Sequence, residues 1–123
     1  AAISDKPVGI DVERIRPYDK DLVQRFFTKS DFEYLDSMKK SEVNKKFTEV
    51  WTFKEATCKM MDRPLMQILQ WIDYSEYCDC EKGNTYWTKQ GFEFRDFYIT
   101  LCYEDKRQPI QMGLYNPYDG KYY

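Results

Sequence analysis

The feature that most constrains the fold is a long helical run near the middle of the chain. Residues 41–61 contain no glycine or proline, and their apolar side chains recur at the spacing of a helix. Residues 62–64, Asp-Arg-Pro, end the run. Trp51, Glu55 and Lys59 fall four residues apart and therefore share one ridge. The ordinary interpretation is a surface helix with a weak Glu55–Lys59 ion pair.

Length and composition indicate one folded domain. A chain of 123 residues allows a single domain with a real core, and 42% hydrophobic and 18% aromatic residues are too many for a disordered chain. The net charge of −2 does not favour nucleic acid or an anionic membrane surface as a partner. We expect no membrane span, because no apolar run approaches the length that one needs.

The absence of histidine limits the available chemistry. Acid–base catalysis would have to use carboxylates, lysine, tyrosine, cysteine or water. Cys78 and Cys80 are one residue apart, whereas zinc pairs usually have two residues between them, and no second pair follows. We therefore expect the four cysteines, which include Cys58 and Cys102, to be free thiols in a reducing cytoplasm.

A short acidic strand precedes the helical run. Residues 8–15 alternate, so Ile10 and Val12 face one way while Asp11 and Glu13 face the other. The ordinary interpretation is apolar side chains inward and acidic side chains outward. The functional alternative is a pair of carboxylates about 7 Å apart on one strand face, converging on a cation.

The remaining pattern predicts an α+β fold, with one strand and then three helices packed on a mainly antiparallel sheet. Asp19 is the expected N-cap of the first helix, and the capping box at residues 30–33 is expected to open the second. The C-terminal strands are expected within residues 71–114. The expected segments are a helix at 19–27, a short turn or helix at 65–69, strands at 72–77, 85–89, 92–103 and 109–114, and turns at 82–84 and 116–120.

Two stretches together resemble a known family. Gly9-Ile10-Asp11, followed about forty residues later by Trp51-Thr52-x-Lys54-Glu55-Ala56-x-x-Lys59, is similar to the paired motif of 4′-phosphopantetheinyl transferases. The acids of Asp11-Val12-Glu13 resemble the two-lobed surfactin-synthetase-activating type more than the small trimeric holo-acyl-carrier-protein synthases. Arg25-Phe26-Phe27 is similar too. The resemblance covers residues 8–59 well, and beyond residue 64 it rests on strand order.

The resemblance implies an activity. These enzymes transfer the phosphopantetheine arm of coenzyme A to a serine of an acyl or peptidyl carrier protein, and 3′,5′-ADP leaves. The carriers are of the fatty-acid, polyketide or peptide type. A diphosphate needs a divalent cation to neutralise its charge, and Mg²⁺ prefers oxygen ligands.

The resemblance also implies roles for individual residues. Asp11, Glu13 and Glu55 match the magnesium ligands, and Glu55 also matches the general base. Lys59 matches a phosphate-binding lysine, and Lys54 is a second candidate for that role. We expect Trp51 to pack the helix against the strand.

A basic segment after the first strand matches the family region that helps to dock an acidic carrier protein. Basic side chains would steer such a partner. The alternative is a solvated loop, because Asp19 and Asp21 interrupt the segment. The candidate docking residues are Arg14, Arg16, Lys20 and Arg25.

The chain resembles only the C-terminal lobe of the two-lobed type. The first lobe of that type normally supplies a histidine and basic residues for the coenzyme A phosphates, and neither is present here. We therefore expect residues 1–123 to form one lobe, completed by a missing N-terminal lobe or by self-association into a homo-oligomer. The alternative hypothesis is a non-catalytic lobe that binds a carrier protein or has a structural role.

Overall fold

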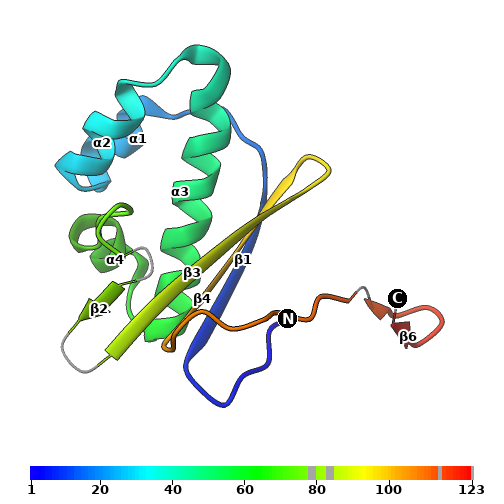
Figure 1. Ribbon diagram of the computed structural model, residues 1–123. Coiled ribbons are helices and arrows are strands. Elements are labelled where there is room, and N and C mark those ends of the chain that lie inside the picture. Colours follow the sequence, from blue (N-terminus) through cyan, green and yellow to red (C-terminus); the bar gives the residue numbers. More distant parts are fainter. Residues whose placement is uncertain (78–79, 83–84, 114, 123) are drawn as a thin grey trace.

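The computed structural model places one long helix across a small antiparallel sheet, and it describes residues 1–77, 80–82, 85–113 and 115–122. In Figure 1 α1, α2 and α4 lie to the left of α3, β3 and β4 run diagonally across it, and the short strand β2 lies below α4. The expected α+β class is confirmed. The elements are β1 (Val8–Arg14), α1 (Lys20–Phe26), α2 (Lys29–Asp36), α3 (Lys40–Met61), α4 (Leu65–Trp71), β2 (Cys80–Lys82), β3 (Thr85–Phe94), β4 (Phe97–Tyr103), β5 (Tyr115–Asn116) and β6 (Lys121–Tyr122).

The sheet has the strand order β1-β4-β3-β2, and all its pairs are antiparallel. The N-terminal strand β1 therefore pairs with the late strand β4, with Asp11 opposite Thr100 and Glu13 opposite Tyr98. The hairpin β5–β6 is separate and stands apart from the body in Figure 1. Among the described helices, none combines the length and the apolar character that a membrane crossing needs.

Helix α3 packs very closely on β1. A Cβ atom added to Gly9 would lie 1.8 Å from the carbonyl oxygen of Ala56, so only glycine allows this approach. The buried hydroxyls of Thr52 and Thr100 are hydrogen-bonded at 2.7 Å, which ties α3 to β4 as well. The helix ends at Asp62, which has a left-handed φ of 51° and donates its N–H to the carbonyl of Cys58.

Two apolar clusters form the core, one along the N-terminal half of α3 and one along its C-terminal half. Trp51 packs on the first of them, where its ring stacks at 6.1 Å on Phe27. Trp51 therefore has a core packing role, as expected, and the rings that it packs against are Phe27 and Phe47. The first cluster contains Val23, Phe27, Leu35, Val43, Phe47, Val50 and Leu69, and the second contains Phe53, Ala56, Met60, Ile68, Ile72 and Cys102.

A single carboxylate joins α3, β4 and the segment after α4. Glu49 Oε1 accepts hydrogen bonds of 2.9 Å from the hydroxyls of both Tyr74 and Tyr98. Lys46 lies 2.5 Å from Glu49 Oε2. Burial and the Glu49 charge raise the pKa of both phenols above their usual value of 10.0. The network therefore holds both tyrosines in their neutral form.

The single strand expected at residues 92–103 is in fact a hairpin. Residues 95 and 96 form a turn between β3 and β4, and Arg95 has a left-handed φ of 56°. The Asp96 carboxylate in this turn forms an ion pair with Arg14 of β1, with 2.9 Å between Oδ2 and Nε. The turn has no glycine, proline or asparagine, and its one local signal is the adjacent polar pair Arg95-Asp96, which interrupts the apolar alternation.

The strand expected at residues 72–77 is absent from the structure, which has a turn at 74–77. Its backbone is bonded elsewhere: the carbonyl of Ile72 accepts from Lys54, and the N–H of Tyr74 donates to Asp31. Residues 109–113 also form no strand. The short segment at 65–69 is the helix α4, and a turn at 117–120 confirms the last turn expected.

The helix caps were predicted with mixed success. Asp19 caps α1 as expected, accepting from the N–H of Leu22 at 3.0 Å. Helix α2 begins earlier than the capping box suggested, because Thr28 is the N-cap and accepts from the N–H of Asp31 at 3.1 Å. Residues 83–84 of the turn expected at 82–84, and Cys78, lie outside the described residues. Cys58 and Cys102 are free cysteines, as expected.

Candidate active site

The acidic face of β1 is turned toward α3. Asp11 is only 8% exposed and Glu13 is half-buried, whereas Val12 between them is 50% exposed. Because α3 packs on the face that carries Gly9, the neighbouring acids at alternate positions face the helix too. The interpretation with acidic side chains turned outward is therefore wrong.

Lys59 bridges the helix to the strand. Its ammonium donates to Asp11 Oδ1 at 2.9 Å and to the backbone carbonyl of Ile10 at 3.0 Å. The hydrogen bond to Asp11 raises the pKa of Lys59. Asp11 Oδ2, in contrast, is buried and has no hydrogen-bond partner. One oxygen of this carboxylate is thus satisfied and the other is open.

Glu55 lies one turn before Lys59 on the same ridge. Partial burial raises the pKa of Glu55, and the negative charges of Asp11 and Glu13 raise it further, while Lys59 opposes them. Glu55 is therefore repelled by the charges of both Asp11 and Glu13. The Glu55–Lys59 ion pair of the ordinary interpretation is not formed, since Lys59 pairs with Asp11 instead.

This acidic group suits a hard divalent cation. All its donors are carboxylate oxygens, one buried oxygen lacks a partner, and the like charges on the acids would be relieved by a cation. The acids do not form a closed cage: over the described residues, no three His, Cys, Asp or Glu side chains are grouped closely enough to hold a metal ion. The carboxylate oxygens are of the kind that Mg²⁺ prefers, but as placed these residues do not by themselves form a metal site.

Lys54 lies away from this group. Its side chain has no exposed surface, and its ammonium lies 2.5 Å from Asp31 Oδ2 and donates to the carbonyls of Leu69 and Ile72 at 3.1 and 2.6 Å. Burial lowers the pKa of Lys54, and Asp31 opposes this. These contacts join α3 to α2 and α4, and nothing in the geometry supports the phosphate-binding role expected for Lys54.

Sequence reasoning missed Asp31 as the partner of Lys54. It assigned Asp31 to a capping box, because the motif Ser-Asp-Phe-Glu is a local signal. The signal that could have revealed the pair is an aspartate at a core-facing position of a short helix, which needs a buried cation.

The four candidate docking residues have different surroundings. Arg14 and Lys20 are tied to aspartates, at 2.9 Å from Asp96 and 3.1 Å from Asp36. Arg16 is held over the ring of Trp51 at 5.0 Å, and Arg25 is exposed on α1. Arg16 therefore lies at the N-terminal end of the ridge that carries Glu55 and Lys59.

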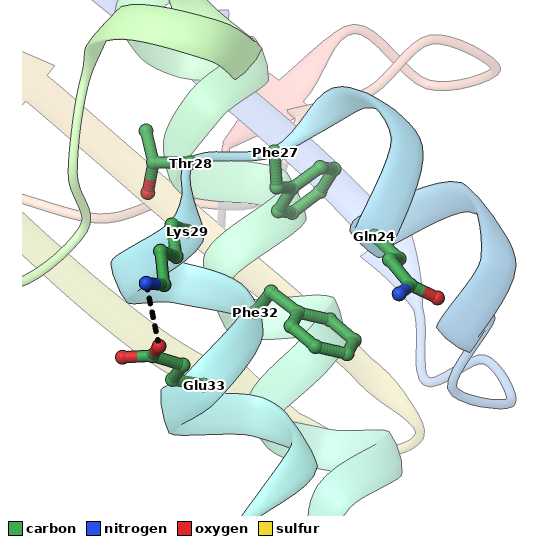
Figure 2. Close-up of a pocket in the computed structure, with 6 residues that line it drawn as sticks. All are labelled: Gln24, Phe27, Thr28, Lys29, Phe32 and Glu33. Carbon is green, nitrogen blue, oxygen red and sulfur yellow. Dashed lines mark ion pairs between the residues drawn. The ribbon is translucent and has the colours of Figure 1, made fainter.

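A cavity of about 410 Å³ lies between α1 and α2, as Figure 2 shows. An ion pair of 3.7 Å between Lys29 and Glu33 lies beside it. None of the acidic motif residues contributes to its wall, so the cavity is separate from the candidate site. Its lining residues are Gln24, Phe27, Thr28, Lys29, Phe32 and Glu33.

Comparison with protein families decides which family this geometry belongs to. The model of the 4′-phosphopantetheinyl transferase superfamily matches residues 7–113, which include β1, all of α3 and the β3–β4 hairpin. The chain belongs to the 4′-phosphopantetheinyl transferase superfamily. The resemblance found in the two motifs is therefore confirmed.

Three curated 4′-phosphopantetheinyl transferases are similar to part of this superfamily member. The enzyme gsp of Aneurinibacillus migulanus is 34% identical over 77 residues, which are 61% of this chain and 32% of the relative. The enzyme psf-1 of Bacillus pumilus is 37% identical over 59 residues, which are 48% and 25%. Sfp of Bacillus subtilis strain 168 is 31% identical over 64 residues, which are 52% and 29%. The matched part is thus a third or less of each relative.

Proposed function

We propose that this chain is one lobe of an enzyme that transfers the phosphopantetheine arm of coenzyme A to a serine of a carrier protein. The observation that carries the proposal is the meeting of Asp11, Glu55 and Lys59 where α3 crosses β1. Family membership supports it, since the matched relatives are named 4′-phosphopantetheinyl transferases. The proposed donor substrate is coenzyme A.

In this proposal Asp11, Glu13 and Glu55 hold a Mg²⁺ ion. The ion supplies charge neutralisation for the diphosphate and its leaving group. Glu55 accepts the proton of the attacking serine, directly or through water, as a positioned general base. Lys59 binds a phosphate oxygen as a compact charge.

The rest of the site is proposed to come from a second lobe. The matched relatives are much longer than the regions that match, so their sites can draw on residues with no counterpart here. That second lobe is either an N-terminal lobe or another copy of this chain. Arg16 and Arg25, which have no carboxylate partner within the described residues, are the proposed docking contacts for an acidic carrier protein.

The test is transfer of a fluorescent phosphopantetheine arm from a coenzyme A analogue to a purified carrier protein. Mg²⁺-dependent labelling by the chain supports the proposal, and labelling that persists in EDTA contradicts the metal role. If the chain binds the carrier protein but does not label it, even when an N-terminal lobe is added, the result would support the non-catalytic alternative.

Glu55→Gln isolates the proposed base. We expect it to lower the transfer rate by roughly 10²–10⁴-fold, the usual contribution of a positioned acid or base, while the fold is retained. Glu42→Gln is the matched control, because Glu42 is exposed in the first turn of the same helix. Unchanged transfer in Glu55→Gln would remove Glu55 from the mechanism.

A further inference from the structure

Lys59 and the proposed metal compete for one carboxylate. The ammonium already lies 2.9 Å from Asp11 Oδ1, and the side chain of Asp11 is 10% exposed whereas that of Lys59 is 52% exposed. The lysine therefore reaches down from the surface onto a nearly buried acid. Within the part of the chain that the structure describes, Lys59 is the one cation ion-paired with any of the three acids.

The ion pair with Lys59 satisfies only one of the two carboxylate oxygens of Asp11. Asp11 Oδ2 is buried without a hydrogen-bond partner, and Glu13 and Glu55 contribute further negative charge beside it. The Lys59 ammonium is paired with Asp11 and also feels the charge of Glu55. A buried carboxylate oxygen without a hydrogen-bond donor destabilises the folded chain, so binding a second cation at this oxygen would be favourable.

We infer that Lys59 is an internal counter-ion of Asp11, and that a divalent cation displaces it and so frees its ammonium to bind a phosphate. The inference rests on the proposed function, because it takes the three acids as the metal site. A cation on either oxygen of Asp11 would lie close to the ammonium, and like charges at that separation repel. The metal would thus prepare the site for its anionic substrate.

The lysine can leave without a change of the backbone. Its half-exposed side chain is a flexible four-carbon stem in the last turn of α3, so the ammonium can swing away from Asp11 while the helix stays in place. Its second contact, the carbonyl of Ile10, is exposed and can be hydrated instead. Metal and phosphate would therefore bind cooperatively through one side chain.

The rival role for Lys59 is to orient Asp11 for the metal, as a positioning residue. The two roles predict opposite signs. If Lys59 competes, its removal strengthens metal binding. If it orients Asp11, its removal weakens metal binding.

The first experiment measures Mn²⁺ affinity of the full chain by electron paramagnetic resonance, with Mn²⁺ as the probe for Mg²⁺. For Lys59→Met we expect affinity about tenfold tighter than in the unmodified chain, within the usual range of site coupling. Lys59→Arg should remain near the unmodified chain, because it keeps the charge. The matched control is Arg63→Met, which removes an exposed positive charge four residues later without contact to Asp11, and should change affinity less than about twofold.

The second experiment measures 3′,5′-ADP binding by calorimetry with and without Mg²⁺. This probe carries no diphosphate to bridge the ion. We expect Mg²⁺ to tighten 3′,5′-ADP binding in the unmodified chain about fivefold or more, and to have little effect in Lys59→Met. Circular dichroism confirms that each variant is folded.

The outcomes separate the two proposals. Weaker or unchanged Mn²⁺ binding in Lys59→Met overturns the inference and leaves the proposed metal site intact. No Mn²⁺ binding by the unmodified chain overturns the inference together with the metal role in the proposed function. Equal effects of Lys59→Met and Arg63→Met also overturn the inference, since they would show only a long-range charge effect.

Discussion

Two lysine–aspartate pairs lie five residues apart on the same helix, and they differ in almost every physical respect. Lys54 and Asp31 are buried, at 0% and 2% side-chain exposure, and Lys54 has two further carbonyl partners. Lys59 is half-exposed, and its partner Asp11 keeps one oxygen without a hydrogen bond. The first pair is closed and the second is open.

The difference shows that the residue types in a motif do not by themselves give each residue its role. Positions 54 and 59 point to different sides of α3, one toward α2 and α4 and the other toward β1. A closed buried pair can hold helices together, while an open pair at an edge can exchange its partner for a ligand. Burial and remaining hydrogen-bond capacity distinguish the two.

The largest effect expected is on stability, from breaking the closed pair. Lys54→Met leaves Asp31 as an unpaired buried charge, which typically costs about 3–5 kcal/mol. Urea unfolding followed by circular dichroism measures the change. A loss below about 1 kcal/mol, the range of surface pairs, would show that the two pairs are energetically alike.

The matched control for that prediction neutralises both partners. Asp31→Asn keeps an acceptor for the N–H of Tyr74, and combined with Lys54→Met it removes the buried charges together. We expect the double variant to be more stable than Lys54→Met alone, because the unpaired charge is gone. If the double variant is less stable than Lys54→Met, the cost does not come from the uncompensated charge.

The sequence predicted the elements better than their partners. Spacing alone placed Asp11 and Glu13 on a strand, and Glu55 and Lys59 on one ridge of a helix that the structure ends at Met61, as expected. Their convergence followed from the family resemblance rather than from the spacing. Which face of β1 was buried depended on Gly9, whose close contact with Ala56 is a tertiary fact.

The errors arose where long-range contacts replaced local preferences. The run at residues 92–103 was expected to be one strand, but it turns at Arg95 and Asp96, where an ion pair joins Asp96 to Arg14 on another strand. Residues 72–77 alternate like a strand, but their backbone serves the buried Lys54–Asp31 pair. Neither contact is visible within a local window of sequence.

The next largest loss of stability is expected from disturbing the close packing of β1 on α3. Of the two lysine–aspartate pairs, only Lys59–Asp11 joins these two elements. In Gly9→Ala the added methyl meets the backbone of Ala56, so the strand must move, and we expect a loss of about 1–3 kcal/mol. Nuclear magnetic resonance shift changes should be concentrated at Asp11 and Lys59. Comparable changes at Lys54 would contradict the independence of the two pairs.

Gly91→Ala is the matched control on the same face of the sheet. Its added methyl would meet the hydroxyl and ring atoms of the Tyr98 side chain rather than backbone. We expect a smaller loss than for Gly9→Ala, because the clash involves no backbone atom, although the buried Tyr98 ring must shift and its hydrogen bond to Glu49 is disturbed. An equal or larger loss would mean that the backbone contact at Gly9 is not special.

The two lysines should also titrate in opposite directions from their usual pKa of 10.5. Burial lowers the pKa of Lys54, and the bond to Asp11 raises that of Lys59. The stabilisation from Lys59 is therefore complete below pH 10.5 and is lost as pH rises through its folded pKa. Carbon-13 shifts of the lysine ε-methylenes measure both midpoints, and midpoints in the reverse order would contradict the assignment of the closed and open pairs.

The smallest effect is expected from breaking the open pair. Lys59→Met removes an ion pair whose lysine is 52% exposed, so water can replace much of the interaction, and we expect a stability change within about 1 kcal/mol. Urea unfolding under the conditions used for Lys54→Met gives a direct comparison. A loss as large as that of Lys54→Met would mean that Lys59 is a structural lysine. Asp11 could not then exchange Lys59 for a metal ion without disrupting the packing of α3 on β1.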